Sequence, residues 1–161
     1  LDVLLILFLW SPLVVVLALL LLKVDRYFGL APFIGFPHNI ILSLIFFILG
    51  IAIVWRAYAY LVIVGEGGPC PQLGVTVGPY SWVRHPSVIG KLLGVIGLGC
   101  FLKATTFTFV IVPLLFIGSA IYNRFIQEKG CVKKFGDEYI KYRQQVPMFI
   151  PKLRKPKPKP K

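Results

Sequence analysis

Charged side chains are scarce in this sequence. Only 15% of its 161 residues are charged, and only six are acidic. Because about a quarter of the residues in a soluble domain are charged, this balance excludes an ordinary soluble fold. Hydrophobic residues make up 57% of the chain and its mean hydropathy is +0.81. At this length we expect one small membrane domain.

Side chains that bind metals or form disulfides are also few. The chain has three cysteines, Cys70, Cys100 and Cys131, and two histidines, His38 and His85. None of them pairs at the short spacing typical of metal ligands. We therefore predict neither a structural metal nor a disulfide.

Long apolar runs dominate instead. A helix needs about 20 apolar residues to cross the hydrocarbon layer. Four runs come near that length: Leu1–Leu22, Asn39–Tyr60, Pro86–Leu102 and Thr105–Tyr122. The sequence therefore predicts an all-α integral membrane protein with about four transmembrane helices. Residues 1–151 would form the membrane domain.

Two of these runs carry further signals. The first run starts abruptly, which suggests that residues precede Leu1. It lacks a basic leader and a small-residue cleavage site, so we expect a retained helix and not a signal peptide. The third run contains Gly90, Gly94, Gly97 and Gly99, whose spacing favours close helix packing. We expect a turn around Lys103 before the fourth run.

Basic residues predict the orientation. Lysines and arginines are frequent after Tyr122. By the positive-inside rule, loops next to membrane helices that are rich in lysine and arginine lie on the cytoplasmic side. The C-terminus and the Leu61–Arg84 loop should therefore be cytoplasmic, although Lys23 and Arg26 argue mildly against this.

The C-terminal region has two parts. Charges alternate with apolar residues at helical spacing from Arg124 onward, which predicts an interfacial helix interrupted at Gly136 and ended by Pro147. Residues 152–161 alternate lysine or arginine with proline and supply six of the eighteen basic side chains. They predict a disordered tail that attracts anionic lipid headgroups. We expect no nucleic-acid partner.

Polar residues concentrate at two other places. Arg84 and His85 precede Pro86, a residue suited to the first turn of a helix whose N-terminus favours an anion. They would form a carboxylate or phosphate pocket, or else Arg84 reaches headgroups and His85 caps the helix. Arg124 and Glu128, four residues apart, share one helical face. They would form a weak surface pair or face a ligand.

These residues belong to an ordered series of motifs. The series runs Gly65-x-Gly67-x-Pro69, Gly78-x-Tyr80-x-x-x-Arg84-His85-Pro86-Ser87, Arg124-x-x-x-Glu128, Phe135-Gly136-x-Glu138-Tyr139-x-x-Tyr142 and Val146-Pro147. Over residues 65–151 the chain resembles the integral-membrane methyltransferases typified by isoprenylcysteine carboxyl methyltransferase, which have phospholipid N-methyltransferases as relatives. The resemblance implies methyl transfer from S-adenosylmethionine to a lipophilic acceptor, such as an isoprenylcysteine carboxylate or a lipid amine, at the cytoplasmic surface.

The resemblance also implies a set of site residues. Those expected to bind S-adenosylmethionine are Gln72, Leu73, Gly74, Val75, Tyr80, Arg84, His85, Pro86, Ser87, Val88 and Glu128. Arg124 would face the acceptor, and His85, Arg124 and Glu128 would be the catalytic residues. We expect His85 and Glu128 to lie at a wet interface. The family usually has tyrosine where this chain has Val88, and often a second acid at the position of Gln127.

Two alternatives remain open. A membrane reductase of the sterol-reductase type resembles this fold and would use NADPH, but Lys91-Leu92-Leu93 follows Gly90 where further acidic and aromatic residues are expected. A small helical membrane subunit without catalytic activity also fits the size of the chain.

Overall fold

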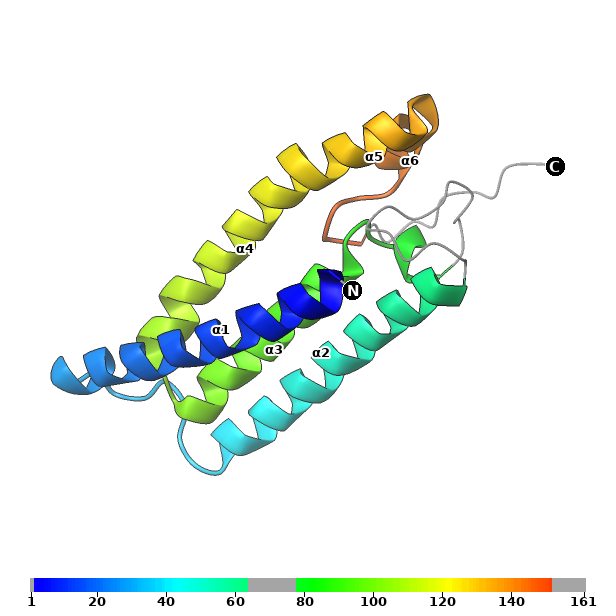
Figure 1. Cartoon of the computed structure of the whole chain (residues 1–161). Coiled ribbons are helices and arrows are strands. Elements are labelled where there is room, and N and C mark those ends of the chain that lie inside the picture. The colour runs from blue at the N-terminus through cyan, green and yellow to red at the C-terminus, as the bar shows by residue number, and fades with distance from the viewer. Residues whose placement is uncertain (1, 64–77, 152–161) are drawn as a thin grey trace. The chain divides into compact units, whose positions relative to one another are not determined.

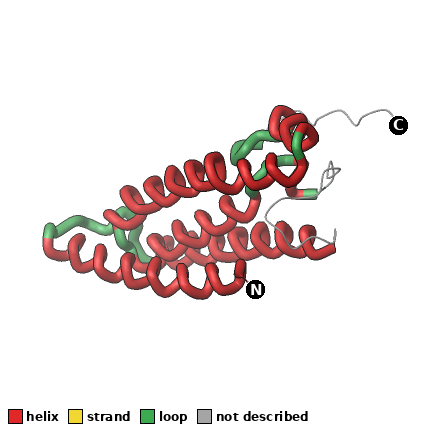
Figure 2. Tube along the Cα trace, turned by 45° about the horizontal axis from the view of Figure 1, so that its top comes forward, coloured by secondary structure: helices red, strands yellow, loops and turns green. Residues whose placement is uncertain are grey.

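The computed structural model describes residues 2–63 and 78–151, and all regular structure within those ranges is helical (Figures 1 and 2). The α-helices are α1 (Asp2–Tyr27), α2 (His38–Ile63), α3 (Pro86–Leu102), α4 (Val112–Tyr122), α5 (Glu128–Phe135) and α6 (Asp137–Gln145). Shorter helical turns are η1 (Pro79–Ser81), η2 (Phe107–Ile111) and η3 (Asn123–Gln127). The all-α prediction is confirmed for the described residues.

Two helices are long and apolar enough to cross a membrane. They cover His38–Val62 and Phe107–Phe135, whereas Pro86–Leu102 is apolar but shorter. Only 17% and 11% of the residues in their most apolar windows are buried. They are therefore not core helices of a soluble protein, and their exposed apolar surface requires a nonpolar surrounding. The count of four spans stays a prediction.

The second of these helices extends beyond the predicted run. We expected the span to end at Tyr122, but the helix continues to Phe135 through the π-helical turn η3. No proline or other strong helix breaker occurs between Tyr122 and Glu128, so the backbone continues although the side chains become polar. The predicted break at Gly136 is confirmed, since this glycine has φ of 58° and separates α5 from α6.

The chain divides into two compact units. One comprises Leu1–Gly50 and Leu92–Phe116, and the other comprises Ile51–Lys91 and Ile117–Lys161.

In the first unit, small residues allow helices to pack closely. The buried cluster is formed by Ala18, Ala104, Phe107 and Val112. A Cβ on Gly97 would lie 3.2 Å from the Ser43 carbonyl oxygen, and one on Gly99 would overlap Thr108. The packing role predicted for these two glycines is confirmed, whereas a Cβ on Gly94 would meet nothing.

A buried carboxylate joins the two parts of this unit. The buried Asp25 lies near the end of α1, and its carboxylate accepts a hydrogen bond from the Thr106 backbone N–H at 3.1 Å. This bond satisfies a backbone donor at the start of the helix that contains η2. The turn before that helix includes Lys103, whose φ is 55°, as the sequence predicted.

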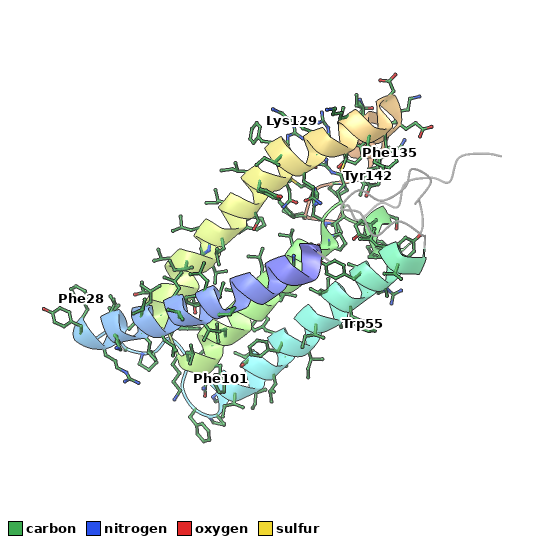
Figure 3. All side chains as sticks on the ribbon, in the orientation of Figure 1. Phe28, Trp55, Phe101, Lys129, Phe135 and Tyr142 are labelled. Atoms are coloured by element: carbon green, nitrogen blue, oxygen red, sulfur yellow. The ribbon has the colours of Figure 1, made fainter. Side chains whose placement is uncertain are left out.

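The second unit contains the described motif residues and is built around aromatic side chains. Tyr80 is buried with Ala57 and Leu61, and Tyr139 is buried with Cys131 between α5 and α6. Phe135 and Tyr142 pack against the latter pair where the two helices meet (Figure 3). Cys131 is disulfide-bonded, so the prediction of no disulfide is wrong. Spacing along the sequence does not reveal cysteines that folding brings together.

Candidate functional site

Glu128 is the centre of the candidate site. It begins α5, directly after the π-helical turn η3, and only 1% of its side chain is exposed. A π-helical turn adds one residue to the helix and shifts the side chains that follow it, which is why such turns often occur at functional sites. We expected this carboxylate to lie at a wet interface, but it is buried, so that expectation is wrong.

Arg84 and His85, which are neighbours in the sequence, both contact the same carboxylate oxygen of Glu128. Arg84 donates from Nη1 to Oε1, and His85 Nε2 lies 3.3 Å from the same oxygen. Arg84 and His85 are themselves 7% and 6% exposed. Motifs more than forty residues apart in the sequence thus form one buried ionic cluster.

Some polar atoms in this cluster have no partner among the described residues. Glu128 Oε2 and Arg84 Nε are both buried without a hydrogen bond. Arg124 Nη1 lies 3.6 Å from Glu128 Oε2, close enough for an ion pair but too far for a hydrogen bond. Buried polar groups nearly always find a partner, so these two atoms have hydrogen-bonding capacity that the described residues do not use.

Arg124 differs from the other two cations because it is half exposed, at 48%. It lies on η3, four residues before Glu128, as the i,i+4 spacing predicted. The structure thus places Arg124 between the buried cluster and the surface.

The C-terminal segment holds the Arg84–His85 backbone in place. The Arg84 N–H donates to the Pro147 carbonyl at 2.9 Å, and the His85 N–H donates to the Met148 carbonyl at 3.2 Å. The His85 ring also lies 6.0 Å from the Phe149 ring, centroid to centroid. The sequence did not predict these backbone hydrogen bonds, which clamp Arg84 and His85, because backbone acceptors leave no residue-specific signal beyond the helix end at Pro147.

Tyrosines connect the same elements. The Tyr142 hydroxyl donates to the Tyr80 carbonyl at 2.8 Å, and the Tyr139 and Tyr142 rings lie 5.7 Å apart. Burial raises the pKa of Tyr139 to about 12, and the nearby Glu128 charge adds to this shift. Burial likewise raises the pKa of Tyr80 and Tyr142, so all three phenols keep their protons at neutral pH.

The turn before Arg84 depends on a glycine. Gly78 has φ of 90°, and a Cβ there would lie 2.5 Å from the Tyr60 ring. The Ser81 hydroxyl donates to the Gly78 carbonyl at 2.7 Å and closes the turn. This position requires glycine for its conformation and for space.

The remaining predicted site residues fall into two groups. Pro86 is buried at the start of α3, and Ser87 and Val88 follow it, half buried. Tyr80 is buried against α2 residues and bound to Tyr142, so its observed contacts are structural. Gln72, Leu73, Gly74 and Val75, the glycine-rich loop and the 152–161 tail lie outside the described residues.

No group of three potential metal ligands occurs among the described residues. The absence of a metal stays a prediction.

Comparisons with known proteins identify relatives of the chain. A protein-S-isoprenylcysteine O-methyltransferase from Schizosaccharomyces pombe is 34% identical over 104 residues, which are 62% of this chain and 42% of that protein. A protein of the same name from Xenopus laevis is 31% identical over 93 residues, covering 53% of this chain and 30% of that protein. The cobalt-zinc-cadmium resistance protein CzcN from Cupriavidus metallidurans is 32% identical over 106 residues, covering 65% and 46%.

These matches cover only part of each protein. The aligned part spans less than half the length of each of these curated relatives. No family model matches the chain. No solved structure matches it either. Two separate relatives nonetheless share one enzyme name, and the resemblance read from the motifs is confirmed. Over the aligned region the chain is similar to proteins named protein-S-isoprenylcysteine O-methyltransferase.

Proposed function

We propose that the chain carries the cofactor site of an S-adenosylmethionine-dependent methyltransferase that acts on a lipophilic acceptor at the cytoplasmic membrane surface. The observation that carries this proposal is the buried Arg84–His85–Glu128 cluster with two unpartnered polar atoms. The relatives named as methyltransferases and the exposed apolar helices support it.

The cluster has the chemistry to bind an amino acid group such as the one in S-adenosylmethionine. Glu128 Oε2 is an unused carboxylate acceptor suited to an ammonium or a hydroxyl, and Arg84 Nε is an unused donor suited to a carboxylate. His85 would orient the shared Glu128 oxygen and the cofactor carboxylate. Pro86, Ser87 and Val88, which begin α3, would supply the wall beside it.

S-adenosylmethionine would supply an activated methyl group on a sulfonium, which passes to a lone pair of the acceptor and leaves a thioether. The protein then needs to position both molecules and exclude water, and no metal is required. The buried cluster holds its charges away from solvent, and the clamp from Pro147 and Met148 keeps Arg84 and His85 in place. A carboxylate acceptor needs no general base, which fits a site without an obvious one.

Arg124 is suited to the acceptor side. Its guanidinium is half exposed and within 3.6 Å of Glu128 Oε2. A surface position beside the buried cluster would let it attract an anionic group of the acceptor while the apolar part stays in the membrane. An isoprenylcysteine carboxylate, or a lipid amine that carries a nearby phosphate, has this combination.

The direct test is calorimetric titration of the detergent-purified protein with S-adenosylhomocysteine, with NADPH in a parallel experiment. We expect saturable binding of S-adenosylhomocysteine alone. Glu128→Gln removes a charge-assisted hydrogen bond and should weaken binding about 10-fold to 100-fold. Glu138→Gln, at an exposed position of α6, is the matched control and should bind like the parent.

Each other result has a distinct meaning. Binding of NADPH alone would favour the reductase. Binding of neither compound by a folded protein would make the Glu128 cluster a structural ion pair in a non-catalytic subunit. Equal loss in both variants would move the site away from Glu128.

A further inference from the structure

A groove of about 360 Å³ lies against α5 and α6, on the second unit. Its walls are formed by Arg124, Phe125, Lys129, Val132, Ile140 and Arg143. Three of these residues are cationic and three are apolar. Figure 3 shows Lys129 on the outer side of the helix, away from Phe135 and Tyr142. The groove is therefore separate from the buried cluster around Oε1 of Glu128, and Arg124 is the residue they share.

The groove lies where the exposed surface of one continuous helix changes character. Ile117, Ile121 and Phe125 are 53%, 54% and 58% exposed, and residues spaced by four share a helical face. Lys129 and Lys133 follow on the same continuous helix, and both are exposed cations. Exposed apolar residues suit the hydrocarbon layer, and the cations that follow them suit the headgroup layer. The groove therefore lies at headgroup depth.

Two cations of the groove, Lys129 and Arg143, have no carboxylate partner in the described part of the chain. The ion pairs among the described residues involve Glu128 with Arg84, His85 and Arg124, and none of them includes Lys129 or Arg143. Arg143 is also half buried. Cations that have no carboxylate partner among the described residues attract anions, so an anion from outside the chain would stabilise this surface.

We propose that this groove binds the headgroup of an anionic phospholipid. The phosphate would lie between Lys129 and Arg143, and the first part of an acyl chain would pack on Phe125, Val132 and Ile140. The groove offers the two chemistries of such a lipid side by side, cations for the headgroup and apolar side chains for the chain. This lipid is a bound partner and not the methyl acceptor, so the inference does not depend on the proposed function.

Native mass spectrometry of the detergent-purified full chain tests the inference. The protein is titrated with diheptanoyl phosphatidylglycerol, and in parallel with diheptanoyl phosphatidylcholine and with inorganic phosphate. We expect one phosphatidylglycerol to bind saturably and at least tenfold more tightly than phosphatidylcholine. The double variant Lys129→Gln/Arg143→Gln should bind phosphatidylglycerol about 30-fold more weakly, because two basic contacts are lost.

A matched double variant separates a local site from general attraction. Lys133→Gln/Lys141→Gln removes the same charge from two exposed positions outside the groove. We expect it to bind like the parent. If the first variant melts earlier in lipid-free detergent, the single change Lys129→Gln at an exposed position replaces it, with an expected loss of about fivefold.

Three outcomes would overturn the inference. Equal losses in the two double variants would mean diffuse attraction by the basic surface. Equal binding of phosphatidylcholine would mean an unselective amphiphile site. Competition by inorganic phosphate at the same concentration as the lipid would mean an anion site that does not use the apolar wall.

Discussion

At the scale of single residues, the burial and ion pairing of Glu128 determine the chemistry of the site. Spacing alone allowed a weak surface pair with Arg124, but the carboxylate is buried and also contacts Arg84 and His85. Our expectation that His85 and Glu128 lie at a wet interface was wrong, because both side chains are buried. A one-residue shift of the helix at η3 turns Glu128 inward, and sequence periodicity at 3.6 residues per turn does not anticipate it.

Burial predicts a specific pattern of stability. Glu128→Leu leaves the Arg84 charge buried without its partner and should destabilise the fold by about 3–5 kcal/mol. Arg84→Leu/Glu128→Leu removes both charges and should recover most of that loss, because no isolated charge remains. Thermal melting in one detergent compares the two variants. A double variant no more stable than the single one would mean that the ion pair itself stabilises the fold.

Arg124 should behave differently because half of its side chain is exposed. Arg124→Gln breaks an ion pair at 3.6 Å that solvent already weakens, so the melting temperature should hardly change. Affinity for S-adenosylhomocysteine should fall by no more than about fivefold, whereas turnover with the acceptor should fall much further. Equal losses of affinity and turnover would place Arg124 in the cofactor site.

At the scale of elements, the site depends on how α6 and the segment after it hold the loop before α3. The sequence predicted that the last helix would break at Gly136 and end at Pro147, and both limits are observed. It did not predict that the Pro147 and Met148 carbonyls accept from Arg84 and His85. Those bonds depend on backbone position, which folding brings about and which residue identity does not encode.

Removing the hydrogen bond from Tyr142 to the Tyr80 carbonyl tests whether the C-terminal segment holds the loop before α3. Tyr142→Phe removes one hydrogen bond and leaves a partly buried acceptor without its partner, which should cost about 1 kcal/mol. Hydrogen exchange should quicken in η1 and at the Arg84 and His85 amides, since the same clamp holds them. The exposed Tyr122→Phe is the control and should leave those amides unchanged. Unchanged exchange in both variants would show that the clamp does not hold the loop.

At the scale of the whole molecule, exposed apolar helices and named relatives agree on a membrane protein. The basic residues after Tyr122 predict, by the positive-inside rule, that the C-terminal region is cytoplasmic. A cysteine introduced by Glu138→Cys in α6 should therefore react with a membrane-impermeant maleimide in inside-out vesicles. The parent chain supplies the background. Labelling only in right-side-out vesicles would reverse the orientation and place the candidate site on the opposite side.

The sequence by itself determined the helical class, the apolar runs and the similarity to isoprenylcysteine methyltransferases, because hydrophobic composition and an ordered series of short motifs are properties of the chain. The roles of Gly97 and Gly136 were also predictable from the sequence, because glycine has no Cβ. Gly97 allows close packing against Ser43, and Gly136 adopts a positive φ that breaks the helix. Only the tertiary structure decided that Glu128 is buried, that Arg84 and His85 share one of its oxygens, and that the other oxygen has no hydrogen bond from the described residues. Burial and ion pairing depend on which distant segments meet, and a linear pattern of residues does not specify those distances.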